Sequence, residues 1–247
     1  MKKSYSRVFS DEISAFCPGC THGLVTKIIR RVVAELGIVK ECTGIIGIGC
    51  SELTKPMFEF DCVGSPHGKA AAVATGIVRC NRNRVAFVYQ GDGDGIAIGL
   101  SETLHAANRG EKFASFLINN GKFGMTGGQM APTTVIGQKT STTPDGRRVT
   151  DGHPMKMCEI ISQLDAPVYV ARFALNSPKN VQDAEKGIRK AFEYQIAGKG
   201  YTFVELLSNC PIGLSGTPVE SLKMIDEISS NVFKLGVFRD VYGGVGK

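Results

Sequence analysis

The sequence predicts a single α/β domain built on a doubly wound, mostly parallel sheet. Strand-like and helix-like segments alternate along most of the chain. Residues 84–119 are typical of a strand, a glycine turn, a helix and a second strand, which together make a βαβ unit with parallel strands. A chain of 247 residues is also long enough to bury the sizeable core that such a domain needs.

Each element follows from a local pattern of apolar residues. Residues 22–36 place their apolar side chains on one face of a helix, and residues 42–48 are typical of a short buried strand. The remaining elements expected in chain order are a small-residue helix at 67–79, a strand at 84–90, a helical segment ending near residue 108, a strand at 112–118, a short helix at 155–164, a strand at 168–173, a helix at 178–197 and a strand at 202–207.

Two segments lack such a pattern. Residues 121–154 are rich in Gly, Thr, Pro and Gln, and a loop of this length inside one domain is usually functional or mobile. Residues 210–247 are expected to form an irregular arm that packs against a partner. We therefore treat residues 1–247 as one domain with a long loop and a C-terminal arm.

Composition and charge exclude several classes of function. The net charge of +6 suits either simple solubility or attraction to an acidic partner protein. No stripe of Lys and Arg interleaved with aromatic residues is present, which argues against nucleic-acid binding. No stretch approaches the roughly 20 apolar residues of a membrane span. The basic start of the chain does not resemble a signal peptide, so we expect a cytoplasmic protein.

A glycine–aspartate turn stands where the first strand of the βαβ unit ends. The glycines of Gly91-Asp92-Gly93 let a phosphate approach the backbone, and the following helix start favours its negative charge. Asp92 would repel that phosphate unless a cation lay between them, so its carboxylate is a candidate ligand for Mg²⁺. Asn120 follows the next strand and can supply an amide oxygen to the same ion. The pair predicts a metal–diphosphate site, although ordinary β-turns also use these residue types.

The cysteines favour metal ligation or core packing over a disulfide framework. The chain has 8 cysteines and no secretory signal, the usual companion of disulfide-rich domains. Of these, Cys17 and Cys20 have the close spacing of a metal clip.

Several motifs together resemble the β subunit of the 2-oxoacid:ferredoxin oxidoreductases, a branch of the thiamine-diphosphate enzymes. They span nearly the whole chain in the order expected of that subunit. Besides the glycine–aspartate turn followed by Asn120, they are Cys17-Pro18-Gly19-Cys20-Thr21-His22, Gly47-Ile48-Gly49-Cys50-Ser51, His67-Gly68-Lys69-Ala70, Asn119-Asn120-Gly121-Lys122-Phe123-Gly124-Met125-Thr126-Gly127-Gly128-Gln129 and Leu207-Ser208-Asn209-Cys210-Pro211.

The resemblance implies a thiamine-diphosphate-binding fold and a role for each matching residue. Mg²⁺ would be held by Asp92, by the side chain of Asn120 and by the main-chain carbonyl of Lys122. The other residues that would contact the cofactor are Gly49, Cys50, Ser51, His67, Gly93 and Asp94. One [4Fe–4S] cluster would be held by Cys17, Cys20, Cys50 and Cys210.

The placement of these four cysteines at the ends of expected elements agrees with a shared site. Four thiolates are what a cubane cluster takes, but they suit Zn²⁺ equally well, and unligated thiols are a third interpretation. The family resemblance favours the cluster. The other cysteines are expected to be buried and unligated: Cys42, Cys62, Cys80 and Cys158.

Two histidines are placed near the expected site. His67 precedes the alanine-rich helix, and as a catalytic residue it would contact the cofactor or polarise the substrate; capping of that helix is the alternative. His22 follows the cysteine clip and either donates to a cluster sulfur or caps its own helix.

The resemblance also implies a reaction and partners. A 2-oxoacid would be decarboxylated oxidatively to an acyl group on coenzyme A, with single electrons passing through the cluster to ferredoxin. No residue resembles the glutamate that activates the cofactor's pyrimidine, so an α subunit carrying the pyrimidine domain is expected, with further γ or δ subunits as an option. The chain departs from the family at Phe123, often Tyr, and at Lys69, often Arg.

Other functions stay open at this point. The substrate favoured by the resemblance is 2-oxoglutarate or a branched-chain 2-oxoacid, with pyruvate as an alternative. A non-oxidative thiamine-diphosphate decarboxylase or synthase subunit would leave the four cysteines without a role. A zinc-stabilised scaffold that binds nucleotide diphosphates is a rival from a different class.

Overall fold

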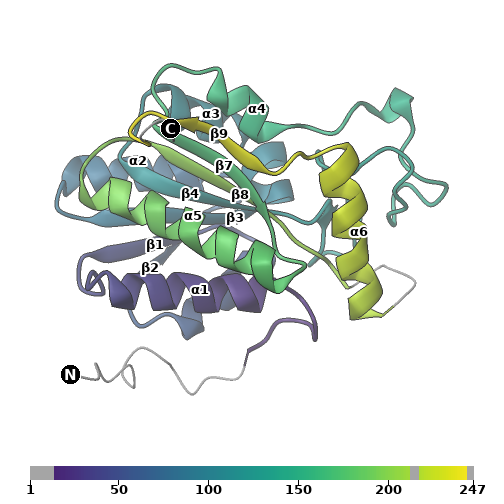
Figure 1. Ribbon diagram of the computed structural model, residues 1–247, viewed down its shortest axis with the longest axis horizontal. Helices are drawn as coiled ribbons and strands as arrows, with labels where there is room; N and C mark the ends of the chain where they lie inside the picture. The colour runs from purple at the N-terminus through teal and green to yellow at the C-terminus, as the bar shows by residue number, and fades with distance from the viewer. Residues whose placement is uncertain (1–13, 212–216, 244–247) are drawn as a thin grey trace.

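A seven-stranded sheet forms the centre of the computed structural model, which describes residues 14–211 and 217–243 (Figure 1). The strands lie in the order β2-β1-β3-β4-β8-β7-β9. Every neighbouring pair is parallel except β7 and β9, so the prediction of a mostly parallel sheet is confirmed. The strands are β1 (Cys42–Ile46), β2 (Asp61–Gly64), β3 (Val85–Gly91), β4 (Phe113–Asn119), β7 (Tyr169–Ala174), β8 (Thr202–Leu207) and β9 (Gly236–Asp240).

Helices cover both faces of this sheet, as a doubly wound fold requires. One face is covered by α1 (His22–Glu35) and α5 (Pro178–Ile196), which lie side by side in Figure 1. The other face is covered by α2 (Ala70–Cys80), α3 (Leu100–Asn108) and α4 (Met157–Ser162). Side chains alternate along a strand, so Phe87 and Tyr89 join the core under α1 and α5, whereas Ala86 and Val88 join the core under α2 and α3. No helix in the described part of the chain is long and apolar enough to cross a membrane.

The C-terminal arm differs from its prediction. Residues 210–247 were expected to be irregular, but the described part contains α6 (Pro218–Asn231) and β9. The helix starts with a capping box, in which Thr217 accepts from the Glu220 N–H while the Glu220 carboxylate accepts from the Thr217 N–H, and Pro218 occupies its first turn. The side chains of Ile225 and Phe233 are buried in a cluster with Ala174 and Leu207. The start-of-helix signal was therefore present in the sequence.

The edge strand β2 and two short turns were also missed. A 3-10 turn at Cys50–Met57 precedes β2, whose four residues are mostly exposed and carry no apolar alternation. A π-helical turn at Gly93–Ile98 links the glycine–aspartate turn to α3. The segment 121–154 is largely irregular, as predicted, apart from the small hairpin of β5 (Lys122–Phe123) and β6 (Gln129–Met130) and a 3-10 turn at Val149–Asp151.

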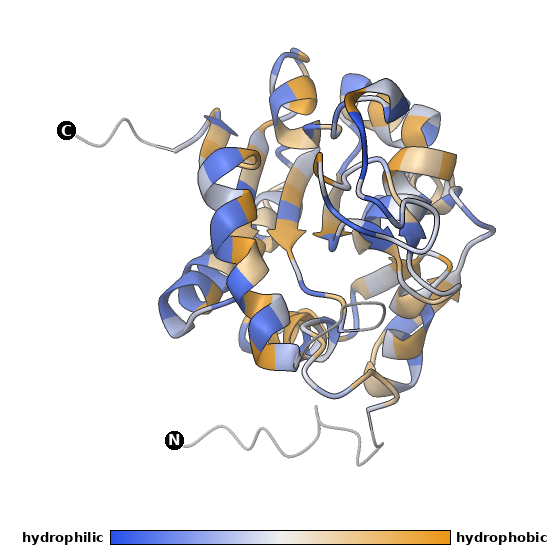
Figure 2. Ribbon diagram, turned by 90° about the vertical axis from the view of Figure 1, so that its right-hand side faces the viewer, coloured by the Kyte–Doolittle hydropathy of each residue, from blue (hydrophilic) through white to orange (hydrophobic). Residues whose placement is uncertain are grey.

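The parallel strands bring their carboxyl ends to one edge of the molecule. Loops after β1, β3, β4 and β8 begin there, and α6 lies at the same side (Figure 1). Figure 2 looks directly at this edge, with the loops in front of the strand ends. In open α/β sheets, ligands bind in the crevice outside these carboxyl ends.

Candidate functional site

All nine residues predicted to contact the cofactor line one cavity of about 150 Å³ at this edge. They come from the segments after β1, β3 and β4 and from the loop between β2 and α2. A larger groove, about 1010 Å³, lies between residues 135–138, residues 153–156 and α6. We assign the site to the smaller cavity, because several buried carboxylate and polar side chains converge there.

Asp92 is buried at the floor of the cavity with both carboxylate oxygens engaged. Oδ1 accepts the Gly93 N–H at 2.8 Å, and Oδ2 accepts the Gly121 N–H at 2.8 Å and the hydroxyl of Thr133. Burial raises the pKa of Asp92 to about 6 in spite of these donors. A cation beside this carboxylate would stabilise its charged form, which is the requirement of a Mg²⁺ ligand.

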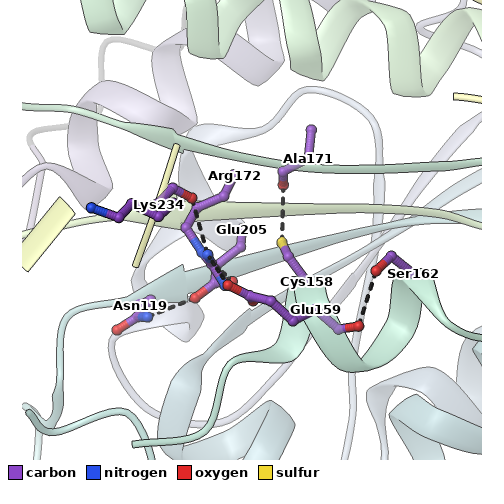
Figure 3. A network of polar contacts seen from close by, with 8 residues as sticks. All are labelled: Asn119, Cys158, Glu159, Ser162, Ala171, Arg172, Glu205 and Lys234. Carbon is purple, nitrogen blue, oxygen red and sulfur yellow. Dashed lines mark hydrogen bonds and ion pairs between the residues drawn. The ribbon is translucent and has the colours of Figure 1, made fainter. Parts of the chain in front are cut away.

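Asn119 and Asn120 direct their side chains to different places. Asn120 lines the cavity, and its Oδ1 accepts the Lys122 N–H at 3.0 Å. The Asn119 Nδ2 instead donates to Glu205 at 2.6 Å, away from the cavity (Figure 3). Lys122 is buried, and desolvation lowers the pKa of its ammonium group. Asn120 and Lys122 thus line the same cavity as Asp92, as a Mg²⁺ site would need.

Glu205 belongs to a buried ionic network behind the Asn119 turn (Figure 3). Arg172 donates to Glu205 at 2.9 Å and to Glu159 at 2.6 Å, and it is fully buried. Its guanidinium lies 5.1 and 5.0 Å from the ring centroids of Phe233 and Phe238. The network ties β4, β7, β8, α4 and the C-terminal segment together.

Asp94 orients His67. The Oδ1 atom of Asp94 accepts from His67 Nδ1 and from the Gly68 N–H, the latter at 2.6 Å, while Oδ2 accepts from Gln90 Nε2 at 2.5 Å. His67 does not cap α2, whose N-cap is Lys69 without a side-chain hydrogen bond. The ring is therefore held at the cavity wall by a buried carboxylate, and its other nitrogen is left for a ligand.

Two features of the cavity suit a phosphorylated cofactor. The Ser51 hydroxyl is buried and lines the cavity, yet it makes no hydrogen bond to any described residue. A buried hydroxyl without a partner costs free energy, which a ligand oxygen would recover. Gly93 packs against the Phe123 ring, so that a Cβ at this position would lie 2.7 Å from Cζ of that ring. The Ser51 hydroxyl thus offers a hydrogen bond to a ligand oxygen, and the contact between Gly93 and Phe123 closes the wall of the site.

The four cysteines of the expected cluster lie at the same edge. A Cβ built on Gly124 would lie 3.2 Å from the Sγ of Cys210 and 3.7 Å from that of Cys50. Burial, with smaller contributions from Cys210, Cys50 and Cys17, raises the pKa of Cys20 to about 11. The Cys20 thiol therefore lies within electrostatic reach of the other three.

No three His, Cys, Asp or Glu side chains within residues 14–211 and 217–243 are grouped closely enough to hold one metal ion. Of the remaining cysteines, Cys42 and Cys158 are buried as expected, and Cys158 donates to the Ala171 carbonyl. The expectation was wrong for Cys80, which is exposed, because it is the last residue of α2 and lies beyond the core contacts of that helix.

Hydrogen bonds join the cysteine clip to the segment that carries Cys210. The Thr21 N–H donates to Asn209 at 3.2 Å, the hydroxyls of Thr21 and Ser208 are 2.6 Å apart, and Asn209 donates to the Gly19 carbonyl at 2.9 Å. Residues near the two ends of the chain are thereby fixed against each other. Asn209 belongs to the motif around Cys210, and no role was predicted for it from the sequence.

His22 is a buried neutral histidine that lines the cavity. Its Nδ1 lies 2.8 Å from the Tyr89 hydroxyl, its ring stacks on Phe16, and burial lowers its pKa to about 4. Thr21, not His22, is the N-cap of α1, so the helix-capping interpretation was wrong. The sequence analysis did not identify Tyr89 and Thr133 as site residues, because neither belongs to a motif. The local sequence around a buried strand or loop residue does not indicate which distant side chain it will contact.

Comparison with known proteins identifies the family of the chain. Residues 47–206 match the family described as thiamine pyrophosphate enzyme, C-terminal TPP binding domain. The chain is 44% identical over 226 residues to ketoisovalerate oxidoreductase subunit VorA of Methanothermobacter marburgensis, covering 91% of this chain and 47% of VorA. It is 34% identical over 230 residues to 2-oxoglutarate synthase subunit KorB of Archaeoglobus fulgidus, covering 92% of this chain and 82% of KorB.

A solved structure shares the fold. The 2-oxoglutarate:ferredoxin oxidoreductase from Magnetococcus marinus, with 2-oxoglutarate, coenzyme A and succinyl-CoA bound, superposes with a TM-score of 0.79 at 25% identity, covering 97% of this chain and 86% of that chain. This chain spans about half the length of VorA, with 47% of it covered. By the family match and by its identity to KorB, the chain belongs to the thiamine-diphosphate-binding subunits of the 2-oxoacid:ferredoxin oxidoreductases.

Proposed function

We propose that the chain binds thiamine diphosphate through Mg²⁺, holds one [4Fe–4S] cluster and serves in the oxidative decarboxylation of a 2-oxoacid. The observation that carries this proposal is the common location of two groups of residues. The cavity residues around Asp92 lie at the same edge of the sheet as the four cysteines, of which Cys50 and Cys210 lie beside Gly124, although these segments are far apart in the sequence.

The residues that would hold the cofactor line one cavity. Asp92 and Asn120 would hold Mg²⁺ with the Lys122 carbonyl, and the Ser51 hydroxyl and His67 would face the cofactor. Thiamine diphosphate, when bound, supplies the carbanion chemistry that releases carbon dioxide from a 2-oxoacid. The chain's part is to hold the metal, to keep the His67 ring in one orientation through Asp94, and to exclude water with the Phe123 ring and the buried loop.

The cysteine site favours a cluster over zinc. A relative from Saccharolobus solfataricus is named 2-oxoacid:ferredoxin oxidoreductase subunit beta, and an enzyme that reduces ferredoxin must handle single electrons. Zinc has no redox chemistry, whereas a [4Fe–4S] cluster on Cys17, Cys20, Cys50 and Cys210 does. A non-oxidative decarboxylase would leave this set of thiols without a use. Reduced thiols for such a cluster persist in the cytoplasm, where we place the protein.

The substrate we favour is a branched-chain 2-oxoacid. Identity to the ketoisovalerate oxidoreductase subunit is 44%, and identity to the 2-oxoglutarate synthase subunit is 34%. 2-Oxoglutarate is the next candidate, and pyruvate follows it. Coenzyme A would accept the acyl group, and ferredoxin the electrons. An α subunit, or an equivalent domain, would bring the pyrimidine-activating carboxylate, and γ or δ subunits would complete the assembly.

Anaerobic co-purification with the partner subunit tests this proposal. We expect four irons per chain and coenzyme A-dependent reduction of ferredoxin, with 2-oxoisovalerate turned over faster than 2-oxoglutarate or pyruvate. Asp92→Ala should abolish thiamine diphosphate binding in Mg²⁺. Carbon dioxide release without reduction of the acceptor, from a complex that contains no iron, would overturn it.

A further inference from the structure

The irregular segment 121–154 is organised around one buried cation, Arg147. Arg147 is 5% exposed, although the segment around it contains no α-helix and no long strand. The guanidinium donates to five main-chain carbonyls: through Nη1 to Ala131 at 3.3 Å, Pro132 at 3.0 Å and Thr134 at 2.6 Å, and through Nη2 to Asp151 at 3.4 Å and His153 at 3.2 Å.

This arrangement replaces the hydrogen bonds that regular structure would supply. Buried carbonyls cost free energy unless they are paired, and the planar fork of an arginine reaches several of them at once. The charge of Arg147 has no carboxylate partner at ion-pair distance among the described residues; nearby Asp151 pairs with Arg148 instead. The guanidinium therefore acts as a structural tie for the turn at residues 131–134.

The turn at residues 131–134 is hydrogen-bonded to the carboxylate of Asp92, both directly and through Gly121. Thr133 donates its hydroxyl directly to Asp92 Oδ2. Thr134 donates its hydroxyl to the Gly121 carbonyl at 2.6 Å, and Gly121 in turn donates its N–H to the same Oδ2 atom at 2.8 Å. Both hydrogen bonds to Oδ2 thus depend on the turn that Arg147 holds.

We infer that Thr133 and Arg147 are positioning residues for the metal site: they hold the Asp92 carboxylate in the orientation in which it binds Mg²⁺. Thr133 acts on the carboxylate itself, and Arg147 acts through the turn that carries Thr133. This inference rests on the proposed function, in which Asp92 is a Mg²⁺ ligand. Partners of metal ligands typically contribute about 10- to 100-fold to metal affinity.

The test measures metal binding rather than turnover. Mn²⁺ replaces Mg²⁺ in the complex with its partner subunit and thiamine diphosphate, and EPR of free Mn²⁺ gives the affinity. Thr133→Val keeps the shape of the side chain without its hydroxyl, and we expect about 10-fold weaker binding or more. Thr133→Ser restores the donor and should restore binding to within about 3-fold. Arg147→Gln should weaken binding as Thr133→Val does, whereas the neighbouring exposed Arg148→Gln should leave it unchanged.

The outcomes separate this inference from the proposed function. Unchanged Mn²⁺ affinity in Thr133→Val, or equal loss in the Val and Ser variants, overturns the positioning role. If Arg147→Gln does not fold, the Val and Ser pair decides the outcome. Asp92→Asn is the reference variant. Loss of binding in Asp92→Asn with normal binding in Thr133→Val removes this inference alone, and normal binding in Asp92→Asn removes the proposed metal site itself.

Discussion

Gly93 lies directly against the ring of Phe123, so that a methyl group at position 93 would lie 2.7 Å from Cζ and closer still to two other ring carbons. The glycine belongs to the turn after β3, and the aromatic ring belongs to the hairpin after β4. The two loops that shape the diphosphate site are thereby packed without space between them. The Phe123 ring could not pack this closely against any larger residue at position 93.

Gly93→Ala should therefore displace Phe123 and lower the affinity for thiamine diphosphate by about 10-fold or more, since overpacking typically costs about 1–3 kcal/mol. Calorimetry on the complex with the partner subunit would measure the change. Gly76→Ala is the matched control, because a Cβ in that helical position meets nothing within 4 Å. It should leave cofactor affinity unchanged and stabilise the fold by about 0.5–1 kcal/mol. Equal cofactor affinities in the two variants would contradict the packing argument.

Cys210→Ala should lower the iron content, because it leaves three thiolates for a four-iron cluster. Cys158→Ala also removes a buried thiol, but one that donates to the Ala171 carbonyl at 3.4 Å and lies apart from the other four. We expect full iron content and an unchanged EPR spectrum of the reduced protein in that variant. Identical iron content in both variants would remove Cys210 from the ligand set.

Arg172→Leu should destabilise the protein by about 3–5 kcal/mol, because the buried Glu205 would lose the cation that compensates its charge. Urea denaturation would measure the loss, and hydrogen exchange should show earlier opening of β9, which the same arginine contacts through Phe238. Arg189→Leu tests the matched case of a partly exposed pair with Glu35. Its cost should be about 1 kcal/mol or less. Similar losses of unfolding free energy in the two variants would mean that the buried network stabilises the protein no more than a partly exposed ion pair does.

The isolated chain should bind thiamine diphosphate weakly and should not reduce viologen dyes with any 2-oxoacid. No residue in the sequence resembles a pyrimidine-activating glutamate, and VorA, of which this chain spans 47%, has a further half. Addition of the partner subunit should restore both activities. Substantial turnover by the chain alone would show that one of its own carboxylates activates the cofactor, with Glu52 or Glu59 as candidates.

Much of the fold was predictable, because alternating strands and helices leave local periodic patterns. The helix at 22–36 and the strands at 84–90, 112–118 and 202–207 were predicted to within two residues of their observed bounds. The exposed edge strand β2 carries no such pattern and was missed. The helix α6 was missed in spite of its capping box, since its apolar face is narrow and packs on few residues.

The sequence alone was enough to locate the glycine–aspartate turn after β3, the cysteine clip before α1 and the polar residues at strand ends. These features depend on short-range backbone geometry and on residue type, which are readable locally. Three contacts became visible only in the folded chain: Asn209 holds Thr21, Asp94 orients His67 and Thr133 reaches Asp92. Such contacts join segments that are far apart in the chain. They form because the whole fold buries and hydrogen-bonds these side chains together, so neither position carries a local signal of its partner.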